Sequence, residues 1–398
     1  MMIKGHLKQR SAGSWSIILE MGRDPETGKR HQRWVTFRGT KRKAQEELDR
    51  LKAEAINGGF VEPHRLTVSD YLDRWSAEYA ASRVSGTTFQ RYRSIITEHL
   101  KPAFGSLPLM KLSPLNIQAH YTAAMKDGGR KDGKPGGLSA QTILHHHRLI
   151  HEALKMAVRW RLIPVNPADG VEPPKVRRRE IKPIDEMQSV WLIDAALGTR
   201  LHLPIVLAIA AGLRRGEILA LRWSDWEPLT RRLWIRRSVE ETRDGIRFKE
   251  TKSDRMRPIT LPEFAAEVLE SHCASQDELR RLLADEYAPG DLIACVEDGS
   301  LWAPSAFTSA YRALLKRRGL SGPNFHALRH SHASHMLKAG VDPKLISARL
   351  GHSRTSFTMD VYAHLLPGAD ETAAERVNES MAAAMERNRE MAASKAVM

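Results

Sequence analysis

The amino-acid sequence predicts a mainly α-helical fold with small β elements, arranged in two or three domains. Over long stretches, apolar residues recur at intervals of three and four, which is the spacing of a helix that buries one face. The alternation of apolar and polar residues that is typical of strands occurs only in short runs. The chain has 398 residues, and domains of about 100–200 residues are usual, so more than one domain is expected.

Residues 1–60 are expected to form a three-stranded sheet with one helix. Residues 15–19 and 33–37 have strand patterns, and the sequence DPETG at 24–28 has the composition of a turn. Thr40 stands where a helix N-cap is preferred, before a stretch rich in helix formers. This segment has 13 basic and 7 acidic residues, a net charge of +6. A DNA-binding surface is one interpretation, and a solvated basic face without a ligand is the other.

Residues 64–170 are expected to form an all-helical domain. Thr67 and Ser139 can cap its first and last helices, and Ser113 before a proline is a typical helix start. Three histidines at 145–147 lie in the last of these helices. Because successive helical side chains point in different directions, this run has poor geometry for a metal ion and is interpreted as a polar or DNA-facing stretch.

A basic linker at residues 171–183 is expected to join this domain to a last domain at 184–398. It contains the sequence KVRRR between prolines, which favours a semi-extended chain. The last domain is predicted to be α-rich with a small β-sheet insert, and its strand candidates are residues 233–235, 246–248 and 258–261. Residues 371–398 predict a C-terminal helix with an apolar stripe, which packs on its own domain or on a neighbouring subunit.

Composition narrows the class of partner. The net charge is +15 and the sequence pI is about 9.9, which favours nucleic acid. No secretory leader pattern and no apolar run long enough for a membrane span are found, so no membrane association is expected. Two cysteines without a CxxC pair predict neither a disulfide framework nor a zinc site, and they fit a reducing cytoplasm. No cofactor and no metal are expected.

Four local features of the last domain carry the candidate chemistry. In the segment AGLRRGE, Arg214 follows a glycine that allows a tight turn between two helices. In KSDRMR, Lys252 lies between two strand candidates, where a hairpin tip is expected. In HALRHSH, His326 and Arg329 are three residues apart and share one helix face. The fourth feature, LGH, is followed ten residues later by a tyrosine. Each feature is weak alone, and their order and spacing make the signal specific.

Together these motifs resemble the catalytic boxes of the tyrosine recombinases, or phage integrases, and the likeness covers most of the chain. Residues 1–60 resemble the arm-type DNA-binding domain of integrases that recognise two classes of site. Residues 64–170 resemble the family's core-site DNA-binding domain, and residues 184–398 its catalytic domain. Ala211 departs from the pattern, since many members have threonine there.

The resemblance implies a set of six catalytic residues, namely Arg214, Lys252, His326, Arg329, His352 and Tyr362, the last as the nucleophile. Lys249 stays an alternative to Lys252 because it lies only three residues away. We prefer Lys252 because its distance to the following strand fits the family pattern better.

These residue types suit the breakage of a phosphodiester bond. Guanidinium groups stay charged and donate bidentately to the oxygens on which negative charge develops. A tyrosine hydroxyl, with an ordinary pKa of about 10, needs a positive field or a base to attack at neutral pH. We expect His326 to accept a proton, His352 to bond the phosphate and Lys252 to protonate the leaving 5′-oxygen. The resemblance implies a 3′-phosphotyrosyl intermediate, which keeps the bond energy without ATP.

Several neighbouring residues are expected to have supporting roles only. Glu217 should hold the turn of Arg214 through a buried hydrogen bond. His330, His332 and His335 are assigned to other faces of the helix than His326. Tyr311 belongs to an apolar stripe and is interpreted as core, not as a rival nucleophile.

The resemblance also implies the partners. Double-stranded DNA with attachment sites is the expected substrate, bound by a homo-tetramer that exchanges strands through a Holliday junction. A DNA-bending protein and an excision directionality factor are further candidate partners. The expected location is the cytoplasm of a bacterial host, at the nucleoid. The sequence specifies neither the attachment sites nor whether a phage or another mobile element is integrated and excised.

Three alternative functions stay open: a chromosome-resolving recombinase, an enzyme like the type IB topoisomerases, and a catalytically silent DNA-binding regulator. The first usually lacks an extra N-terminal domain, and the presence of all six side chains argues against the last. A metal-dependent transposase is disfavoured because no group of carboxylates lies near the basic motifs.

Overall fold

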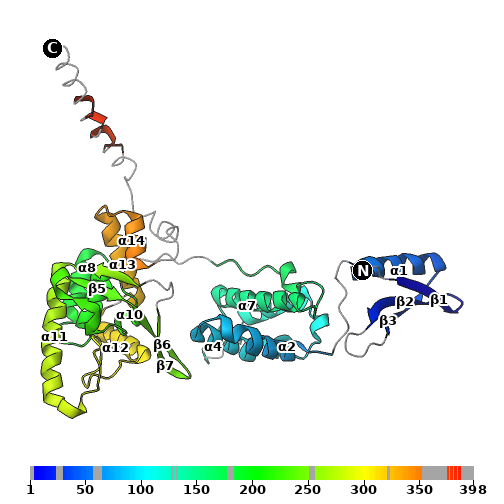
Figure 1. The fold of residues 1–398 in the computed structure, drawn as a ribbon, viewed down its shortest axis with the longest axis horizontal. Helices are drawn as coiled ribbons and strands as arrows, with labels where there is room; N and C mark the ends of the chain where they lie inside the picture. Colours follow the sequence, from blue (N-terminus) through cyan, green and yellow to red (C-terminus); the bar gives the residue numbers. More distant parts are fainter. Residues whose placement is uncertain are drawn as a thin grey trace. The chain divides into compact units, whose positions relative to one another are not determined.

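A computed structural model of the chain describes residues 4–23, 30–56, 65–126, 130, 133–176, 183–250, 256–320 and 323–351, and a few residues between 374 and 386. The described residues are mainly helical, with three small antiparallel sheets among them (Figure 1). The predicted fold class is therefore confirmed. The chain divides into two compact units, Met1–Arg178 and Arg179–Met398.

A three-stranded antiparallel sheet opens the first unit, as predicted. Its strands are β1 (Lys4–Ser11), β2 (Ser14–Arg23) and β3 (Arg30–Arg38), with β2 in the middle, and α1 (Lys41–Ile56) follows. Ile17 and Leu19 on one face of β2 pack with Leu48 and Leu51 of α1 in a small buried core. Because strand side chains alternate between faces, Trp34 of β3 points to the opposite face, where its side chain is 54% exposed.

The predicted helical region follows the sheet. Its helices are α2 (Val68–Trp75) continued by η1 (Ser76–Ala80) and α3 (Ala81–Arg83), α4 (Gly86–Ile95) continued by η2 (Ile96–Leu100) and α5 (Lys101–Phe104), α6 (Pro114–Met125) and α7 (Ala140–Arg159). The three predicted caps are confirmed, since the side chains of Thr67, Ser113 and Ser139 each accept a backbone N–H bond from three residues later. Of the predicted linker, residues 171–176 have no regular secondary structure, and residues 177–182 lie outside the described part.

The histidine run in α7 is not the polar surface that its composition predicted, because its middle member is buried. His146 is fully shielded from water, and its Nδ1 lies 3.2 Å from Nε2 of His120 on α6. The ring of His99 on η2 lies beside that of His146, with centroids 4.8 Å apart. The prediction was wrong for His146, because one face of an amphipathic helix turns inward, whereas His145 and His147 are partly exposed. No group of histidine, cysteine or carboxylate side chains in the described residues has the geometry of a metal site.

We expect the helical region to lose stability in mild acid because of these buried histidines. Burial, and then the charge of His99, lowers the pKa of His120 to about 4 and that of His146 to about 3. In the unfolded chain a histidine has a pKa of about 6.5. The neutral rings therefore contribute fully above pH ~6.5 and progressively less as the pH falls toward the folded pKa values. The free energy of unfolding should drop by about 2 kcal/mol per histidine between pH ~7 and ~5.

Thermal unfolding of the wild type and of His146→Leu at several pH values in this range measures the effect. The variant has an apolar side chain in place of the buried ring, so acidification should destabilise it less than it destabilises the wild type. A His151→Leu control should keep the full acid sensitivity, because His151 lies near the surface, where its Nε2 bonds Asp169. Parallel pH profiles for the wild type and His146→Leu would contradict the assignment.

The second unit is built around α9 (His202–Ala211), whose residues after His202 are all buried. The helices that pack against it include α8 (Glu186–Ala195), α11 (Glu263–Leu283) and α13 (Phe325–Lys338). The remaining helices described in this unit include α10 (Arg215–Ile218), α12 (Pro304–Arg317) and α14 (Pro343–Leu350). The core stripe predicted on α12 is confirmed, since Phe307, Tyr311 and Leu314 are buried.

The predicted β insert consists of two separate pieces. β4 (Trp226–Glu227), β5 (Arg232–Ile235) and β8 (Arg257–Thr260) form one sheet in that order. β6 (Arg237–Thr242) and β7 (Gly245–Glu250) form a two-stranded ribbon that lies between β5 and β8 in the sequence. The three-stranded sheet therefore forms only when β5 pairs with β8, although the residues of the ribbon separate these two strands in the sequence.

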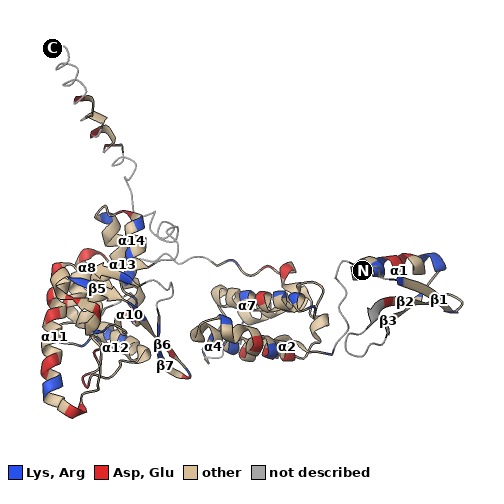
Figure 2. Cartoon of the chain, viewed as in Figure 1, with Lys and Arg blue, Asp and Glu red and all other residues tan. Residues whose placement is uncertain are grey.

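Acidic residues gather on α11 and the segment that follows it (Figure 2). Residues 263–298 contain 10 acidic and 2 basic residues, a net charge of −8, within a chain whose net charge is +15. A surface of this sign repels a polyanion. DNA is therefore expected to contact other parts of this unit.

The described residues between 374 and 386 are helical, and three apolar side chains among them are more than half exposed at intervals of four, namely Val377, Met381 and Met385. This spacing agrees with the apolar stripe predicted for the C-terminal helix. Within the described part of the chain, no helix is long and apolar enough to cross a membrane.

Candidate active site

Arg214 is presented by a tight turn between α9 and α10. α9 ends at Ala211, and Gly212 has a left-handed φ of 66°. A Cβ on this glycine would lie 2.6 Å from side-chain carbons of His332 and Leu350, so only glycine lets the turn approach α13 and α14 this closely. Leu213 is buried, and Arg214 then takes the N-cap position of α10. The close packing of this turn fixes the position of the backbone from which the side chain of Arg214 extends.

Glu217 holds Arg214 from the first turn of α10. Its Oε2 accepts the backbone N–H of Arg214 at 2.9 Å, and its Oε1 accepts Nη1 of the same arginine at 2.7 Å. The carboxylate is 2% exposed, whereas the arginine side chain is 38% exposed. The predicted supporting role of Glu217 is therefore confirmed, and the guanidinium is held in place while part of it stays open to a ligand.

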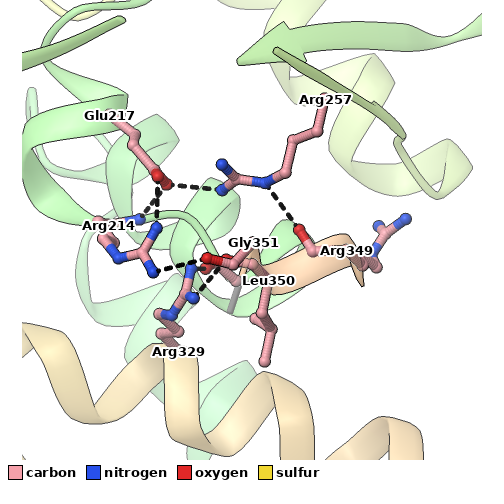
Figure 3. Close-up of polar contacts among 8 residues, drawn as sticks. Arg214, Glu217, Arg257, Arg329, Arg349, Leu350 and Gly351 are labelled. Carbon is pink, nitrogen blue, oxygen red and sulfur yellow. Dashed lines mark hydrogen bonds and ion pairs between the residues drawn. The ribbon is translucent and has the colours of Figure 1, made fainter. Parts of the chain in front are cut away.

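Arg329 joins three elements of the unit. It lies on α13, and its side chain is almost completely buried. Nη1 donates to the carbonyl of Gly212 at 2.7 Å, and Nη2 donates to the carbonyl of Leu350 at the end of α14 (Figure 3). Arg329 therefore ties the Arg214 turn to α13 and α14.

His326 lies on the same helix face as Arg329, as their spacing predicted. Burial, followed by the charges of Arg329 and Arg214, lowers its pKa, and the opposing charge of Glu217 is a smaller influence. A histidine with a lowered pKa is neutral at pH ~7. It can therefore accept a proton there.

The end of α14 is the point where the arginines meet. The carbonyl of Arg349 accepts Nε of Arg257 at 2.9 Å, and that of Gly351 accepts Nη2 of Arg214 at 3.2 Å (Figure 3). With the bond from Arg329 to Leu350, three successive carbonyls each receive a different guanidinium. The last carbonyls of a helix have no partner within it and carry the negative end of the helix dipole, so cations are favoured there.

The structure brings Arg214, His326 and Arg329 together, whereas Lys252, His352 and Tyr362 lie outside the described residues. His352 directly follows Gly351, where the cluster ends. The assignment of all six residues stays a prediction.

Lys249, the alternative lysine, is engaged elsewhere. It lies on β7, and its Nζ is 3.1 Å from Oε1 of Glu240, whose side chain is only 4% exposed. Removing a lysine from a buried carboxylate would leave that charge with less compensation. This pairing argues against Lys249 and favours Lys252 as the catalytic lysine.

The placement of His330 on another face than His326 was wrong. The two rings make an edge-to-face contact with centroids 5.1 Å apart, because residues four apart share a helix face. His332 is a buried structural residue, which donates Nδ1–H to the carbonyl of Ile209 and accepts Nε of Arg349 at Nε2. Burial lowers the pKa of His330 to about 4, so the ring that contacts His326 is neutral at pH ~7.

Arg257 was not among the residues predicted from the sequence. Its side chain is almost buried and reaches both Glu217 and the end of α14. The signal available in the sequence was weak, because a basic residue at the start of a strand is usually solvent-exposed.

Comparison with known proteins decides the family. Residues 183–368 match the phage integrase family, and residues 67–125 match the N-terminal SAM-like domain of phage integrases. The chain belongs to the phage integrase family. The described arginine cluster lies within the first match, and the start of the helical region lies within the second. This phage integrase is therefore a tyrosine site-specific recombinase, as its motifs predicted.

Relatives of this phage integrase span most of its length. A tyrosine recombinase XerC-like protein of Caldanaerobacter subterraneus subsp. tengcongensis is 25% identical, over 92% of this chain and 96% of its own. The ICEBs1 integrase of Bacillus subtilis is 24% identical, over 94% of this chain and 99% of its own. An integrase of Streptomyces ambofaciens is 28% identical, over 87% and 88% of the two chains.

Solved integrases share the fold. The Tn1549 transposon integrase in complex with a circular intermediate DNA has a TM-score of 0.66 at 17% identity, over 78% of this chain and 99% of that chain. A λ integrase tetramer bound to a Holliday junction has a TM-score of 0.55 at 21% identity, over 88% and 96% of the two chains. At these identities the likeness concerns the fold.

Proposed function

We propose that the arginine cluster is the site where this phage integrase breaks and rejoins DNA through a 3′-phosphotyrosyl intermediate on Tyr362. The observation that carries the proposal is the meeting of Arg214 and Arg329 at the end of α14, with a neutral His326 beside them. Two guanidinium groups and a proton acceptor are what the transfer of a phosphoryl group from DNA to a tyrosine requires.

Each residue has one role in the proposed reaction. The tyrosine oxygen forms a bond to phosphorus while the bond between phosphorus and the 5′-oxygen breaks. Arg214 and Arg329 stabilise the charge on the non-bridging oxygens, and His352 adds a hydrogen bond to them. His326 takes the proton of the tyrosine, and Lys252 gives a proton to the leaving 5′-oxygen. The reverse reaction with the 5′-hydroxyl of another strand rejoins the DNA.

Covalent trapping tests this function. The purified full-length protein is mixed with duplex DNA that carries the attachment site and a nick close to the cleavage point, so that the short cleaved strand diffuses away. Neither metal nor ATP is added. We expect a DNA–protein adduct on a denaturing gel. Site-specific binding without any adduct would instead indicate a catalytically silent DNA-binding protein, and relaxation of supercoiled DNA without joining of two sites would indicate an enzyme like the type IB topoisomerases.

The proposal extends to the domains and partners predicted from the sequence. Residues 1–60 would bind arm-type sites and residues 64–170 core sites, with the basic linker at 171–183 lying along the DNA and residues 184–398 performing catalysis. Four protomers would exchange strands through a Holliday junction, and the exposed stripe of Val377, Met381 and Met385 offers an apolar contact for such an assembly. A DNA-bending protein and an excision directionality factor would assist on the chromosome of a bacterial host, in its cytoplasm.

The face of the N-terminal sheet that carries Trp34 is the proposed arm-site reader. In the register of the sheet, Trp34 lies beside Ile18, which lies beside His6, and the next pair on this face is Ser16 with Lys8. Trp34, His6 and Lys8 are exposed. A sheet face of this kind can enter a DNA groove, with basic residues on phosphates and larger side chains on base edges.

We expect Trp34→Ala to weaken binding to attachment-site DNA with flanking arm sequences by about tenfold, since an exposed tryptophan that becomes buried in an interface is often a major contributor to affinity. Cleavage of a short duplex with only the core site should not change. Gel-shift titration at fixed salt and the trapping assay measure the two quantities. The matched control is Trp191→Ala, because Trp191 is 56% exposed on α8 in the other unit. Equal affinities for all three proteins would contradict the assignment of this face.

A further inference from the structure

Arg257 lies at the junction of the β sheet and the arginine cluster. It is the first residue of β8, five residues after Lys252, and pairs with Ile235 of β5. Its Nη2 donates to Oε2 of Glu217 at 2.9 Å, and its Nε donates to the carbonyl of Arg349 at 2.9 Å. The side chain is 10% exposed. Both of these hydrogen bonds of the guanidinium are therefore made to groups inside the protein.

The carboxylate of Glu217 accepts hydrogen bonds from two arginine side chains. Its Oε1 accepts the side chain of Arg214, and its Oε2 accepts both the backbone N–H of Arg214 and the side chain of Arg257 (Figure 3). Burial by itself would raise the pKa of Glu217, but the charge and hydrogen bond of Arg257, followed by those of Arg214, hold this pKa below its ordinary value. Of the two arginines, Arg257 has the larger influence on the carboxylate.

This arrangement gives the group of Arg214, Glu217 and Arg257 a net positive charge. One carboxylate shared by two guanidinium groups gives the trio a net positive charge, whereas an isolated pair of Arg214 and Glu217 would be neutral. Guanidinium groups bind phosphate largely through charge-assisted hydrogen bonds. A phosphate that approaches the exposed part of Arg214 therefore meets a positive site because Arg257 offsets the charge of Glu217.

Arg257 also supports the turn that leads to His352. Gly351 has a left-handed φ of 63°, and a Cβ on this residue would lie 3.0 Å from Nη1 of Arg257. The guanidinium is therefore packed against Gly351 while it bonds the carbonyl of Arg349. One side chain thus contacts the carboxylate that holds Arg214 and the backbone at the end of α14.

We infer that Arg257 is a positioning residue for cleavage, which acts through Glu217 to keep the surroundings of Arg214 net positive and Arg214 correctly placed for the scissile phosphate. The inference rests on the proposed function of the cluster. It assigns Arg257 no contact with DNA, so the effect of its loss should fall on the rate of cleavage and not on DNA affinity.

Arg257→Gln, Arg257→Lys, Glu217→Gln and the double variant Arg257→Gln/Glu217→Gln test the inference in the full-length protein. Single-turnover adduct formation at saturating nicked DNA gives the rate, gel-shift titration gives the affinity, and thermal unfolding gives the stability. The matched control is Arg237→Gln. Arg237 donates to both oxygens of Asp225, a carboxylate that is only 2% exposed, so the control also removes an arginine from a buried carboxylate.

We expect Arg257→Gln to slow adduct formation by about 10–100-fold, the usual effect of losing a group that orients a catalytic one, with unchanged DNA affinity. Arg257→Lys should recover part of the rate, because it keeps the charge beside Glu217. Arg257→Gln should have a much smaller effect in the Glu217→Gln background, where no carboxylate needs to be offset. Arg237→Gln should lose stability without a comparable loss of rate.

Two results would overturn the inference. One is an equal loss of rate in Arg257→Gln and Arg237→Gln, which would mean that only general stability matters. The other is a double variant without coupling: its loss of rate would equal the product of the losses in Arg257→Gln and Glu217→Gln, and its loss of unfolding free energy would equal their sum. A wild type that binds its site but forms no adduct would overturn the proposed function instead, and the coupling in unfolding would still decide whether Arg257 acts through Glu217.

Discussion

Tyr362→Phe is expected to abolish the covalent DNA–protein adduct while DNA binding stays intact. Phenylalanine lacks the oxygen that forms the bond to phosphorus in the proposed reaction, so no other feature of the site can compensate for its loss. The loss should exceed the detection range of the trapping gel, since removal of a nucleophile can cost about 10⁶-fold in rate. The affinity should be unchanged, because a hydroxyl group contributes little to an interface in which phosphate contacts dominate.

Tyr311→Phe is the matched control for this prediction. Tyr311 is buried in the core of the same unit, where its hydroxyl donates to the carbonyl of Pro323 at 3.2 Å. Burial raises its pKa above the ordinary value, which makes it a poor nucleophile. The control should form the adduct as the wild type does. An adduct that persists in Tyr362→Phe would mean that another residue is the nucleophile.

The sequence predicted those parts of the fold and the site that depend on neighbouring residues. The caps at Thr67, Ser113 and Ser139 involve a side chain and a backbone N–H three residues apart, so the local sequence contains both partners. The proximity of His326 and Arg329 was predicted for a similar reason, since it needs only the geometry of one helix.

The parts that the sequence did not predict depend on distant partners. Glu217 and Arg257 are 40 residues apart in the chain and meet only because β8 pairs with β5 and packs near α10. The burial of His146 depends on His120 and His99 on two other helical segments. His330 is different, because its position four residues after His326 is local information that would have predicted the ring contact.

Arg214 and Arg329, the two arginines proposed to be catalytic, are expected to differ in what they contribute to stability. Arg329→Gln should slow adduct formation by about 10²–10³-fold, as the loss of a preorganised donor to a developing negative charge does. It should also lower the free energy of unfolding by about 2 kcal/mol or more, because the carbonyls of Gly212 and Leu350 lose charged donors in a site that water does not reach. For a unit of this size that corresponds to about 4–8 °C in Tm.

Arg214→Gln should show a similar loss of rate with a smaller loss of stability. The side chain of Arg214 is 38% exposed, and when it is removed Glu217 keeps Arg257 as a buried counter-charge. Arg329→Lys should fail to restore the rate, because a single ammonium cannot reach two carbonyls and a phosphate in the way a planar guanidinium does. Thermal unfolding and single-turnover trapping of the three variants measure both quantities. If Arg214→Gln proves as destabilising as Arg329→Gln, Arg214 has a larger structural role than its contacts indicate. If Arg329→Gln cleaves DNA at the wild-type rate, Arg329 only joins α13 to α14 and takes no part in the chemistry.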